Sequence, residues 1–188
     1  SIRRQRQMCI RDSKHTETTV CETDDWIAGY AHTYGDNTEV IVASFDSDFF
    51  QLITENVSIL RYRGDNTVIC TPAYLREKFG IEPSQYADFK SLTGDVSDNI
   101  KGADKVGPKT ASSLLSEFGN LENIILNAEA IKKPSIRESI IRNADRLRTN
   151  YKLIKLEGAV PLPFTMEELP YTYDGITTNE VLKGIGVK

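Results

Sequence analysis

The stretch Ser91–Ala111, SLTGDVSDNIKGADKVGPKTA, brings two kinds of chemistry together in one short segment. Its first half carries Asp95 and Asp98, which are three positions apart, so both carboxylates lie on one side of a turn. Its second half is a glycine-punctuated turn, Gly102–Gly107, that opens into a helix at Pro108, a residue favoured at the first helical position. Acidic ligands therefore stand directly beside a loop of the kind that approaches phosphate closely.

The composition limits the class of protein. With 188 residues, 39% of them hydrophobic and 27% charged, the chain can form one good core and a small second domain. No apolar run is long enough to span a bilayer, and no apolar segment of a signal peptide follows the basic start. The 3 cysteines are odd in number and lack CxxC spacing, which argues against a disulfide framework and a zinc site. We expect a cytoplasmic monomer with no membrane partner.

The net charge of -4 is unevenly distributed along the chain. Residues 1–13, SIRRQRQMCIRDS, are rich in arginine and show no apolar periodicity, so they resemble foreign sequence joined to a truncated gene. An authentic disordered basic arm is the alternative. Basic residues also dominate 131–155, where an apolar stripe predicts an amphipathic helix. Its charged face either is merely solvated or follows a duplex phosphate backbone. The stripe consists of Ile136, Ile140, Ile141, Ala144 and Leu147.

The first acidic cluster belongs to a helix that we predict over 21–34. Thr23 is its expected N-cap, and apolar residues recur at helical spacing behind it. Glu22 and Asp25 lie three apart with Asp24 beside them. One acid in a first turn would simply complement the helix dipole. Three neighbouring carboxylates repel one another unless they share a cation, which favours a metal.

The second acidic cluster follows a predicted strand. Residues 39–44, EVIVAS, form a β-branched apolar run that is typical of a strand covered on both faces. Asp46 and Asp48 follow directly, and ligands of α/β sheets bind beyond the carboxyl ends of strands. For an isolated DxD pair, the favoured alternative is that Asp48 caps a short helix through 49–52.

Glycine and proline mark the remaining elements. Residues 57–62 and 67–70 read as a hairpin around 64–66. Arg61 and Arg63 are expected to be solvated edge charges, and contact with a phosphate is the alternative. We then predict helices, which run over 71–80, 81–94, 108–118 and 121–126. The proline-containing segment 158–175 predicts an extended wrap over the surface, and 178–183 predicts a last short helix.

The acidic residues together suit divalent cations. Mg²⁺ is usually held by one or two carboxylates plus water and substrate phosphate, so this set fits two ions better than one. Two such ions would stabilise the attacking and leaving oxygens of a phosphodiester displacement. No His pair, Cys/His dyad or GxSxG sequence offers a competing nucleophile. The seven carboxylates are Glu22, Asp24, Asp25, Asp46, Asp48, Asp95 and Asp98.

Three motifs in this order resemble the 5′ nuclease family, which comprises the 5′–3′ exonuclease domain of bacterial DNA polymerase I and stand-alone flap endonucleases. They are ETDDWIAGYA at 22–31, VIVASFDSDFFQL at 40–52 and FKSLTGDVSDNIKGADKVGPKTASSLLSEFGN at 89–120. The resemblance covers 20–156. It implies an α/β fold: a PIN-like, mostly parallel sheet, incomplete at the N-terminus, followed by an all-helical helix-three-turn-helix DNA-binding region. The implied divisions are 1–13 as a foreign or disordered segment, 14–72 as the rest of the catalytic domain, 73–156 as the helical region and 157–188 as a C-terminal wrap.

The resemblance also implies the roles of individual residues. Glu22, Asp24, Asp25 and Asp46 would surround a first Mg²⁺ or Mn²⁺ ion, and Asp48, Asp95 and Asp98 a second. The hairpin 102–107 would grip duplex DNA and hold a K⁺ ion through backbone carbonyls, with lysines supplying sequence-independent charge. The implied DNA-binding residues are Lys101, Gly102, Lys105, Val106, Gly107, Lys109 and Thr110.

Two departures from the family pattern bear on activity. The usual glycine-aromatic-Glu-Ala-Asp-Asp run reads Val-Cys-Glu-Thr-Asp-Asp at 20–25, which keeps all three acids. The aspartate-bearing first strand and the basic helical arch of the family are not found, which predicts a chain truncated at its N-terminus.

The function that we expect is a structure-specific 5′–3′ exonuclease or flap endonuclease of DNA replication and repair. It would hydrolyse DNA at a 5′ flap, a 5′ end or a nicked duplex by a two-metal mechanism, with metal-bound water as nucleophile. The alternatives are a non-catalytic DNA-binding fragment and a PIN-like ribonuclease. The hairpin sequence argues against the ribonuclease.

Overall fold

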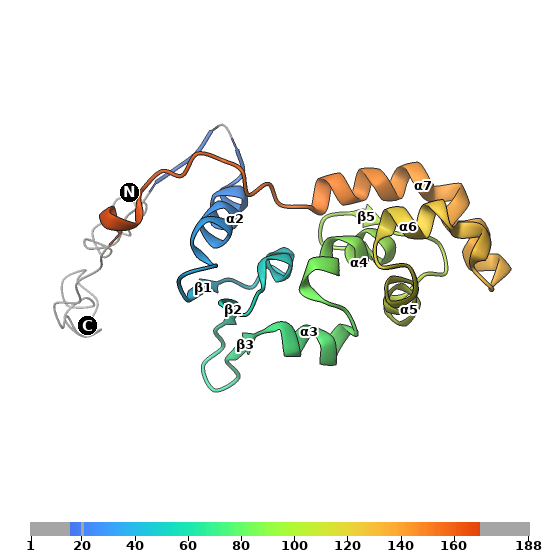
Figure 1. Ribbon diagram of the computed structural model, residues 1–188, viewed down its shortest axis with the longest axis horizontal. Coiled ribbons are helices and arrows are strands. Elements are labelled where there is room, and N and C mark those ends of the chain that lie inside the picture. Colours follow the sequence, from blue (N-terminus) through green and yellow to red (C-terminus); the bar gives the residue numbers. More distant parts are fainter. Residues whose placement is uncertain (1–15, 20, 170–188) are drawn as a thin grey trace, which may run out of the picture.

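The structure is a computed structural model that describes residues 16–19 and 21–169 (Figure 1). The chain passes from α2 (Thr23–Tyr34) through a small sheet into a series of helices, and its last described segment returns to α2. The basic segment 1–13, the end of the expected wrap and the expected helix over 178–183 lie outside the described residues. In the part of the chain that is described, no helix is both long and apolar enough to cross a membrane.

The sheet contains the predicted hairpin. β1 pairs parallel with β2, which places Val42 opposite Ile59, and β2 pairs antiparallel with β3, which places Ile59 opposite Cys70. The prediction that the first strand is covered on both faces is wrong. Val42 is 9% exposed whereas its neighbour Ile41 is 52% exposed, because successive side chains point to opposite faces and the described elements bury one face only. The strands are β1 (Val40–Ala43), β2 (Val57–Arg61) and β3 (Val68–Cys70).

The helical region follows the predicted glycine and proline signals. The first of these helices begins at Pro72 after Thr71 and ends at Gly80, whose φ of 69° is the left-handed conformation that glycine adopts most easily. The long helix α7 packs along α4 and α6. The helices are α3 (Pro72–Phe79), α4 (Tyr86–Thr93), α5 (Pro108–Phe118), α6 (Leu121–Leu126) and α7 (Pro134–Ile154). Short 3₁₀ turns are η1 (Asp48–Leu52), η2 (Pro83–Gln85), η3 (Ala128–Ala130) and η4 (Met166–Glu168).

A cluster of aromatic rings joins the sheet to the helices. Phe50, in η1, is fully buried, and its ring centroid lies 5.3 Å from that of Tyr86 and 6.0 Å from that of Tyr74. Edge-on pairs of this kind stabilise a core beyond the area that they bury. The short turn after β1 is therefore held firmly against α3 and α4.

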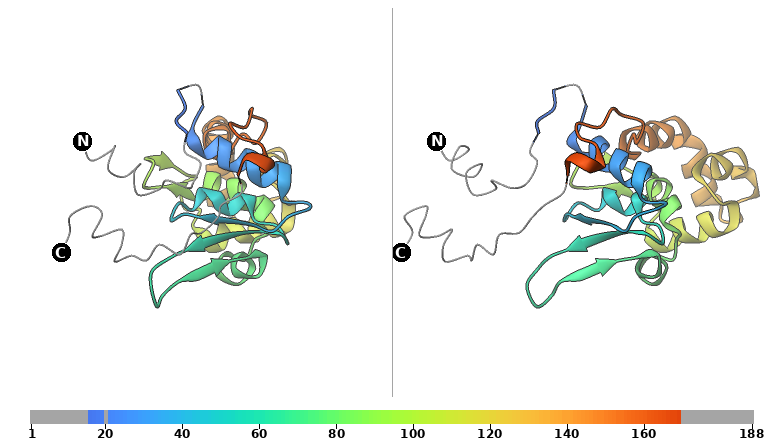
Figure 2. Two further views of the ribbon diagram at one scale, coloured as in Figure 1. Left: turned by 90° about the vertical axis from the view of Figure 1, so that its left-hand side faces the viewer. Right: turned by 60° about the vertical axis from the view of Figure 1, so that its left-hand side comes forward.

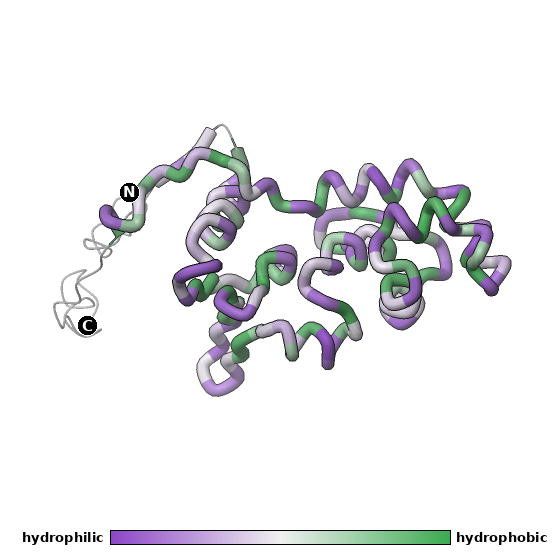
Figure 3. Tube along the Cα trace, in the orientation of Figure 1, coloured by the Kyte–Doolittle hydropathy of each residue, from purple (hydrophilic) through white to green (hydrophobic). Residues whose placement is uncertain are grey.

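Two arginines on the basic face of α7 bond to neighbouring elements. Figure 3 shows hydrophilic and hydrophobic residues alternating along this helix. Within the predicted stripe, Ile140 and Leu147 are fully buried, but Ile141 is 49% exposed and does not belong to the buried face. On the charged side, Arg148 pairs with Glu122, and Arg146 donates to the Gly102 carbonyl. These arginines stabilise the fold, so the expectation of a face free to follow phosphates does not hold for them.

A short two-stranded β-ribbon between α4 and α5 was not predicted from the sequence. It consists of β4 (Gly94–Asp95) and β5 (Ile100–Lys101), which pair antiparallel. Gly94 has a φ of 83°, and a Cβ atom placed on it would lie 2.6 Å from the Gly102 nitrogen. A Cβ atom on Gly102 would lie 2.3 Å from the Leu92 carbonyl oxygen. Two glycines therefore allow the backbones at the base of the ribbon to touch.

The segment after α7 forms a strap across α2, as both views of Figure 2 show. We define the strap as residues 155–169. The Trp26 indole donates to the Pro161 carbonyl at 3.0 Å, and the Tyr30 hydroxyl donates to the Phe164 carbonyl at 2.8 Å. The strap includes residues 158–169, the described part of the expected wrap. It ties the end of the helical region back to the helix that carries the first acids.

Candidate metal centre and nucleic-acid interface

Three of the predicted carboxylates meet in space. Ligand atoms of Asp48, Asp95 and Asp98 all lie within 4.8 Å of one another. Asp48 opens η1 directly after the β1 turn, Asp95 lies in β4, and Asp98 lies in the loop between β4 and β5. The fold thus brings together the set that the resemblance implies for the second ion. We call these three residues the acidic cluster.

Asp48 shows that the acidic cluster fits a cation. Its Oδ1 atom is buried and has no hydrogen-bond partner among the described residues. Burial, together with the nearby Asp46 carboxylate, raises the pKa of the Asp48 carboxyl to about 6, although Lys90 opposes this shift. A buried carboxylate oxygen without a partner costs free energy, and hard divalent cations prefer oxygen ligands. The donor set therefore suits a hard divalent cation.

Asp95 is the most buried member of the acidic cluster, with 6% exposure. Its Oδ2 forms an ion pair with the Lys90 ammonium, while its Oδ1 accepts hydrogen bonds from the Ser97 backbone N–H at 2.9 Å and from the Ser97 hydroxyl. Burial acts to raise the pKa of Asp95, but the bonds from Lys90 and Ser97 outweigh it and leave the pKa below its usual value. Asp95 is consequently ionised at neutral pH.

The turn after β1 orients Asp46 and Asp48 by local hydrogen bonds. The Asp46 N–H donates to the Ser44 hydroxyl at 3.0 Å, and the Asp48 N–H donates to Asp46 Oδ1 at 2.9 Å. The alternative that Asp48 caps a helix is wrong, because Asp48 is the first residue of η1 and makes no such cap bond. Its side chain is left available to a cation.

Arg61 supports this turn and was misjudged from the sequence. Its guanidinium donates to the Phe45 carbonyl and lies 5.3 Å from the Phe50 ring centroid. The expectation of a solvated edge charge is therefore wrong for Arg61. The contact crosses from β2 to the turn after β1, and only the tertiary fold brings them together.

The acids implied for the first ion are less closely gathered. Burial, followed by repulsion from Asp46, Glu22 and Asp25, raises the pKa of Asp24. No group of three including them comes within common ligand distance in the described part of the chain. Asp25 Oδ1 instead accepts the Glu157 N–H of the strap at 3.0 Å. The helix extends over Thr23–Tyr34, within the predicted range, but Glu22 and not Thr23 occupies the N-cap position.

The hairpin 102–107 is held from behind by α7. Arg146 donates to the Gly102 carbonyl at 2.7 Å, and the Asn150 amide donates to the Ser91 and Lys101 carbonyls at 3.2 and 3.0 Å. Neither α7 residue was identified from the sequence, because no local pattern marks a side chain that supports a distant loop. The hairpin is thereby fixed relative to α4.

The outer surface of the hairpin remains open to solvent. Val106 is buried, whereas Lys105, Gly107 and Lys109 are exposed, and a Cβ atom on Gly107 would meet nothing within 4 Å. Lys101 is exposed and pairs with Asp104 at 3.3 Å. Thr110 lies in the first turn of α5, behind Pro108. The predicted DNA-binding residues thus share one loop and helix start.

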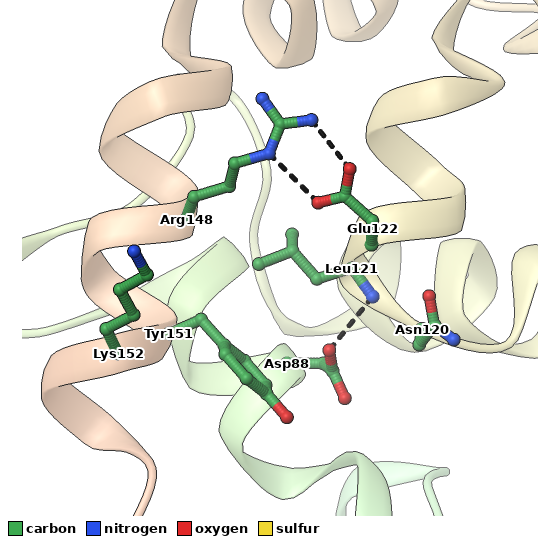
Figure 4. A pocket seen from close by; sticks show the side chains of 7 residues that line it. All are labelled: Asp88, Asn120, Leu121, Glu122, Arg148, Tyr151 and Lys152. Carbon is green, nitrogen blue, oxygen red and sulfur yellow. Dashed lines mark hydrogen bonds and ion pairs between the residues drawn. The ribbon is translucent and has the colours of Figure 1, made fainter.

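A cavity of about 370 Å³ lies elsewhere, between α4, α6 and α7 (Figure 4). Arg148 bonds Glu122 through two nitrogens, at 2.9 and 2.7 Å, and Asp88 Oδ1 accepts the Leu121 N–H at 2.9 Å. These bonds connect three helices and give Arg148, Glu122 and Asp88 structural roles. The remaining lining residues are Asn120, Tyr151 and Lys152.

Two family models match the chain. One, described as the N-terminal resolvase-like domain of 5′-3′ exonuclease, matches residues 7–80, and the other, described as its C-terminal SAM fold, matches residues 81–175. Among curated relatives, thermostable DNA polymerase I of Thermus aquaticus is 39% identical over 142 residues, which is 75% of this chain and 17% of that protein. The 5′-3′ exonuclease of Buchnera aphidicola (from Acyrthosiphon pisum) is 34% identical over 155 residues, 79% of this chain and 54% of the relative. The chain thus spans about half of that exonuclease and less of the polymerase.

Solved structures agree on the fold. The T5 D15 protein co-crystallised with metal ions has a TM-score of 0.67 at 23% identity, over 76% of this chain and 52% of the T5 protein. The T5 5′-exonuclease with bound zinc has a TM-score of 0.64 at 25% identity, over 72% of this chain and 50% of its own. The catalytic core of Rad2 with DNA substrate has a TM-score of 0.54 at 16% identity, over 86% of this chain and 58% of the Rad2 chain. With a resolvase-like sheet followed by a helical SAM-fold region, this chain belongs to the 5′-3′ exonuclease family.

Proposed function

We propose that this chain carries the metal-binding and DNA-binding parts of a divalent-metal-dependent 5′ nuclease that cuts DNA by structure and not by sequence. The convergence of the acidic cluster around a buried, unpartnered oxygen of Asp48 is the observation that supports it most. A divalent ion bound there supplies charge stabilisation for a phosphodiester and activation of water. Other residues of the chain hold the ligand carboxylates in place. Asp95 is fixed by Lys90 and Ser97, and Asp48 is fixed by the turn that Arg61 supports.

A second ion near Glu22, Asp24, Asp25 and Asp46 is part of the same proposal. The mutual repulsion felt by Asp24 supports it, since a shared cation would relieve that repulsion. Mg²⁺ or Mn²⁺ is the expected ion because every candidate ligand is a carboxylate. A K⁺ ion held by hairpin carbonyls stays a prediction.

The hairpin is the proposed contact to DNA. Its exposed glycine and lysines can reach phosphate oxygens, and such contacts position a duplex without reading its bases. The Rad2 core crystallised with DNA substrate and the T5 flap endonuclease crystallised with DNA and metal ions share this fold. We propose a 5′ flap, a 5′ end or a nicked duplex as the substrate class.

The test measures Mn²⁺ binding and cleavage of a 5′-flap DNA. Asp48→Asn should weaken Mn²⁺ binding by tenfold or more, which is roughly 1.4 kcal/mol or more of binding free energy. The reason is that a charged ligand is lost from a partly buried site. Asp36→Asn, at an exposed position outside the acidic cluster, is the matched control and should bind Mn²⁺ as the unaltered chain does. Unchanged binding in Asp48→Asn would refute the metal assignment.

A non-catalytic DNA-binding function is the second candidate. It is favoured by one observation, namely that the acids implied for the first ion do not gather at common ligand distance in the described structure. It predicts salt-sensitive duplex binding that Lys109→Ala weakens, with no metal-dependent cleavage. Cleavage that requires Mn²⁺ would exclude it, and equal cutting of single-stranded RNA would favour the PIN-like ribonuclease instead.

A further inference from the structure

A positively charged side chain that the sequence motifs did not reveal lies against the acidic cluster. Lys90 lies in the last turn of α4, and its ammonium pairs with Asp95 Oδ2. The Lys90 side chain is 15% exposed and that of Asp95 is 7% exposed, so the pair is largely withdrawn from water. Because ligand atoms of Asp95 and Asp48 lie within 4.8 Å of each other, the ammonium that pairs with Asp95 is also close to a second member of the cluster.

The surrounding structure holds Lys90 in place. Tyr86, one helical turn earlier, is 2% exposed and packs against Phe50, and the next residues, Ser91 and Leu92, are fully buried. Asp95 follows directly in β4, so donor and acceptor belong to one continuous segment. The backbone of Lys90 is thus held within reach of Asp95.

The negative charges of the three carboxylates explain why the Lys90 ammonium lies beside them. The three carboxylates of the acidic cluster carry three negative charges when ionised, at a separation at which like charges repel strongly. One ammonium leaves two negative charges, which a single divalent ion neutralises. Without the ammonium, the same carboxylates would attract a divalent ion more strongly and repel one another more in its absence.

We propose that Lys90 is a built-in counter-cation of the metal centre, which holds the acidic cluster together before the ion binds and limits how tightly it binds. This inference rests on the proposed metal function. Lys90 is thus a positioning residue whose removal has two opposite effects, a weaker apo protein and a tighter metal complex. A purely structural ion pair would give only the first effect, because breaking a buried pair leaves an uncompensated charge.

The experiment uses the whole chain with Mn²⁺ alone as the probe. Lys90→Met removes the charge and keeps most of the aliphatic stem, Lys90→Gln is a second neutral variant, and Lys90→Arg keeps the charge. Lys132→Met, at an exposed position, is the control for loss of a lysine. Free Mn²⁺ is measured by electron paramagnetic resonance, and Tm is measured in EDTA and in saturating Mn²⁺.

Both neutral variants should bind Mn²⁺ about tenfold more tightly than the unaltered chain, since one nearby positive charge is gone. Their Tm in EDTA should fall by roughly 4 °C or more and recover when Mn²⁺ is added. Lys90→Arg and Lys132→Met should resemble the unaltered chain.

Three results would overturn the inference. If the neutral variants bind Mn²⁺ equally or more weakly while Asp48→Asn still abolishes binding, Lys90 is only structural and the metal centre stands. If neither the unaltered chain nor any Lys90 variant binds Mn²⁺, the metal function and the inference fail together. If both neutral variants remain unfolded in saturating Mn²⁺, the expected rescue is absent and the inference is rejected.

Discussion

Asp88 is a carboxyl group that the fold keeps away from water and uses to begin another helix. It lies in α4 with 6% exposure, and its Oδ1 accepts the N–H of Leu121, the first residue of α6. Burial raises the pKa of Asp88, although the Leu121 N–H and the charge of Lys155 oppose the shift. In the folded state this carboxyl therefore binds a proton more readily than in the unfolded chain.

The sign of the pH effect follows from that shift. Because the pKa in the folded state is raised, protonation favours folding, so the contribution of Asp88 to the free energy of unfolding grows as pH falls from neutral toward its ordinary pKa. Asp88→Asn, which cannot titrate but keeps an acceptor, should match or exceed the unaltered chain in Tm at pH 7 and lose that advantage by about pH 4–5. Thermal melts across this range measure the difference. A difference that does not vary with pH would contradict the prediction.

Asp88→Ala is the matched control at the same site. It removes the acceptor for Leu121 as well as the charge, so it should lower the free energy of unfolding by about 1–2 kcal/mol.

Lys105 has a left-handed backbone conformation that glycine adopts more easily than lysine. Its φ of 66° at the hairpin tip is left-handed, which costs a residue with a Cβ atom roughly 1 kcal/mol. Lys105→Gly should therefore raise the free energy of unfolding by about 0.5–1 kcal/mol, measured by urea denaturation, while weakening binding to a DNA duplex. Lys105→Ala removes the same charge without relieving the conformation. Equal stability of the two variants would refute the strain argument.

At the scale of elements, the strap adds a second attachment for α2, which also packs against η1 and β1. The Tyr30 hydroxyl donates to the Phe164 carbonyl and also accepts the Phe164 N–H at 3.1 Å. A Cβ atom on Gly158 would lie 2.8 Å from the His32 ring, so the strap approaches α2 at backbone distance. The helix that carries the first acids thus depends on a segment far along the chain.

Tyr30→Phe should release the strap. Loss of both hydrogen bonds should cost about 1–2 kcal/mol of the free energy of unfolding and speed proteolysis within 157–165. Tyr34→Phe is the control, because Tyr34 stacks on Tyr30 with ring centroids 6.1 Å apart but forms no hydroxyl bond that holds the strap. If proteolysis is as slow in Tyr30→Phe as in the control, the strap is held by other contacts.

At the scale of the whole molecule, the described elements bury one face of the sheet and leave the apolar side chains of the other face largely exposed. Ile59 is fully buried, whereas Ile41 and Ile69, on the opposite face, are 52% and 55% exposed. Ile41→Lys should leave Tm nearly unchanged and reduce the binding of an apolar dye, while Ile59→Ala should cost about 2–4 kcal/mol. Urea denaturation and dye fluorescence measure both effects. A large loss of stability in Ile41→Lys would mean that this face is covered.

Helices with proline or glycine at their ends could be predicted from the sequence, whereas contacts between distant segments could not. The helix from Pro72 to Gly80 and the turn before Pro108 carry their own start and stop signals. The partners of Arg61, Lys90 and Arg146 depend on which segments the fold brings side by side. β4 and β5 have 2 residues each, too few to show a period. The acidic cluster was predicted as a set because the family motif carries it, but its lysine was not.

The touching glycines at the base of the ribbon set a rigid spacer between Asp95 and the hairpin. Gly94 and Gly102 leave no room for a Cβ atom on either side, so neither backbone can slide past the other. Under the proposed function, the number of nucleotides between the gripped phosphate and the scissile bond is then a constant of the fold. Variants that alter the hairpin should change how often the DNA is cut, and the cut should stay at the same nucleotide.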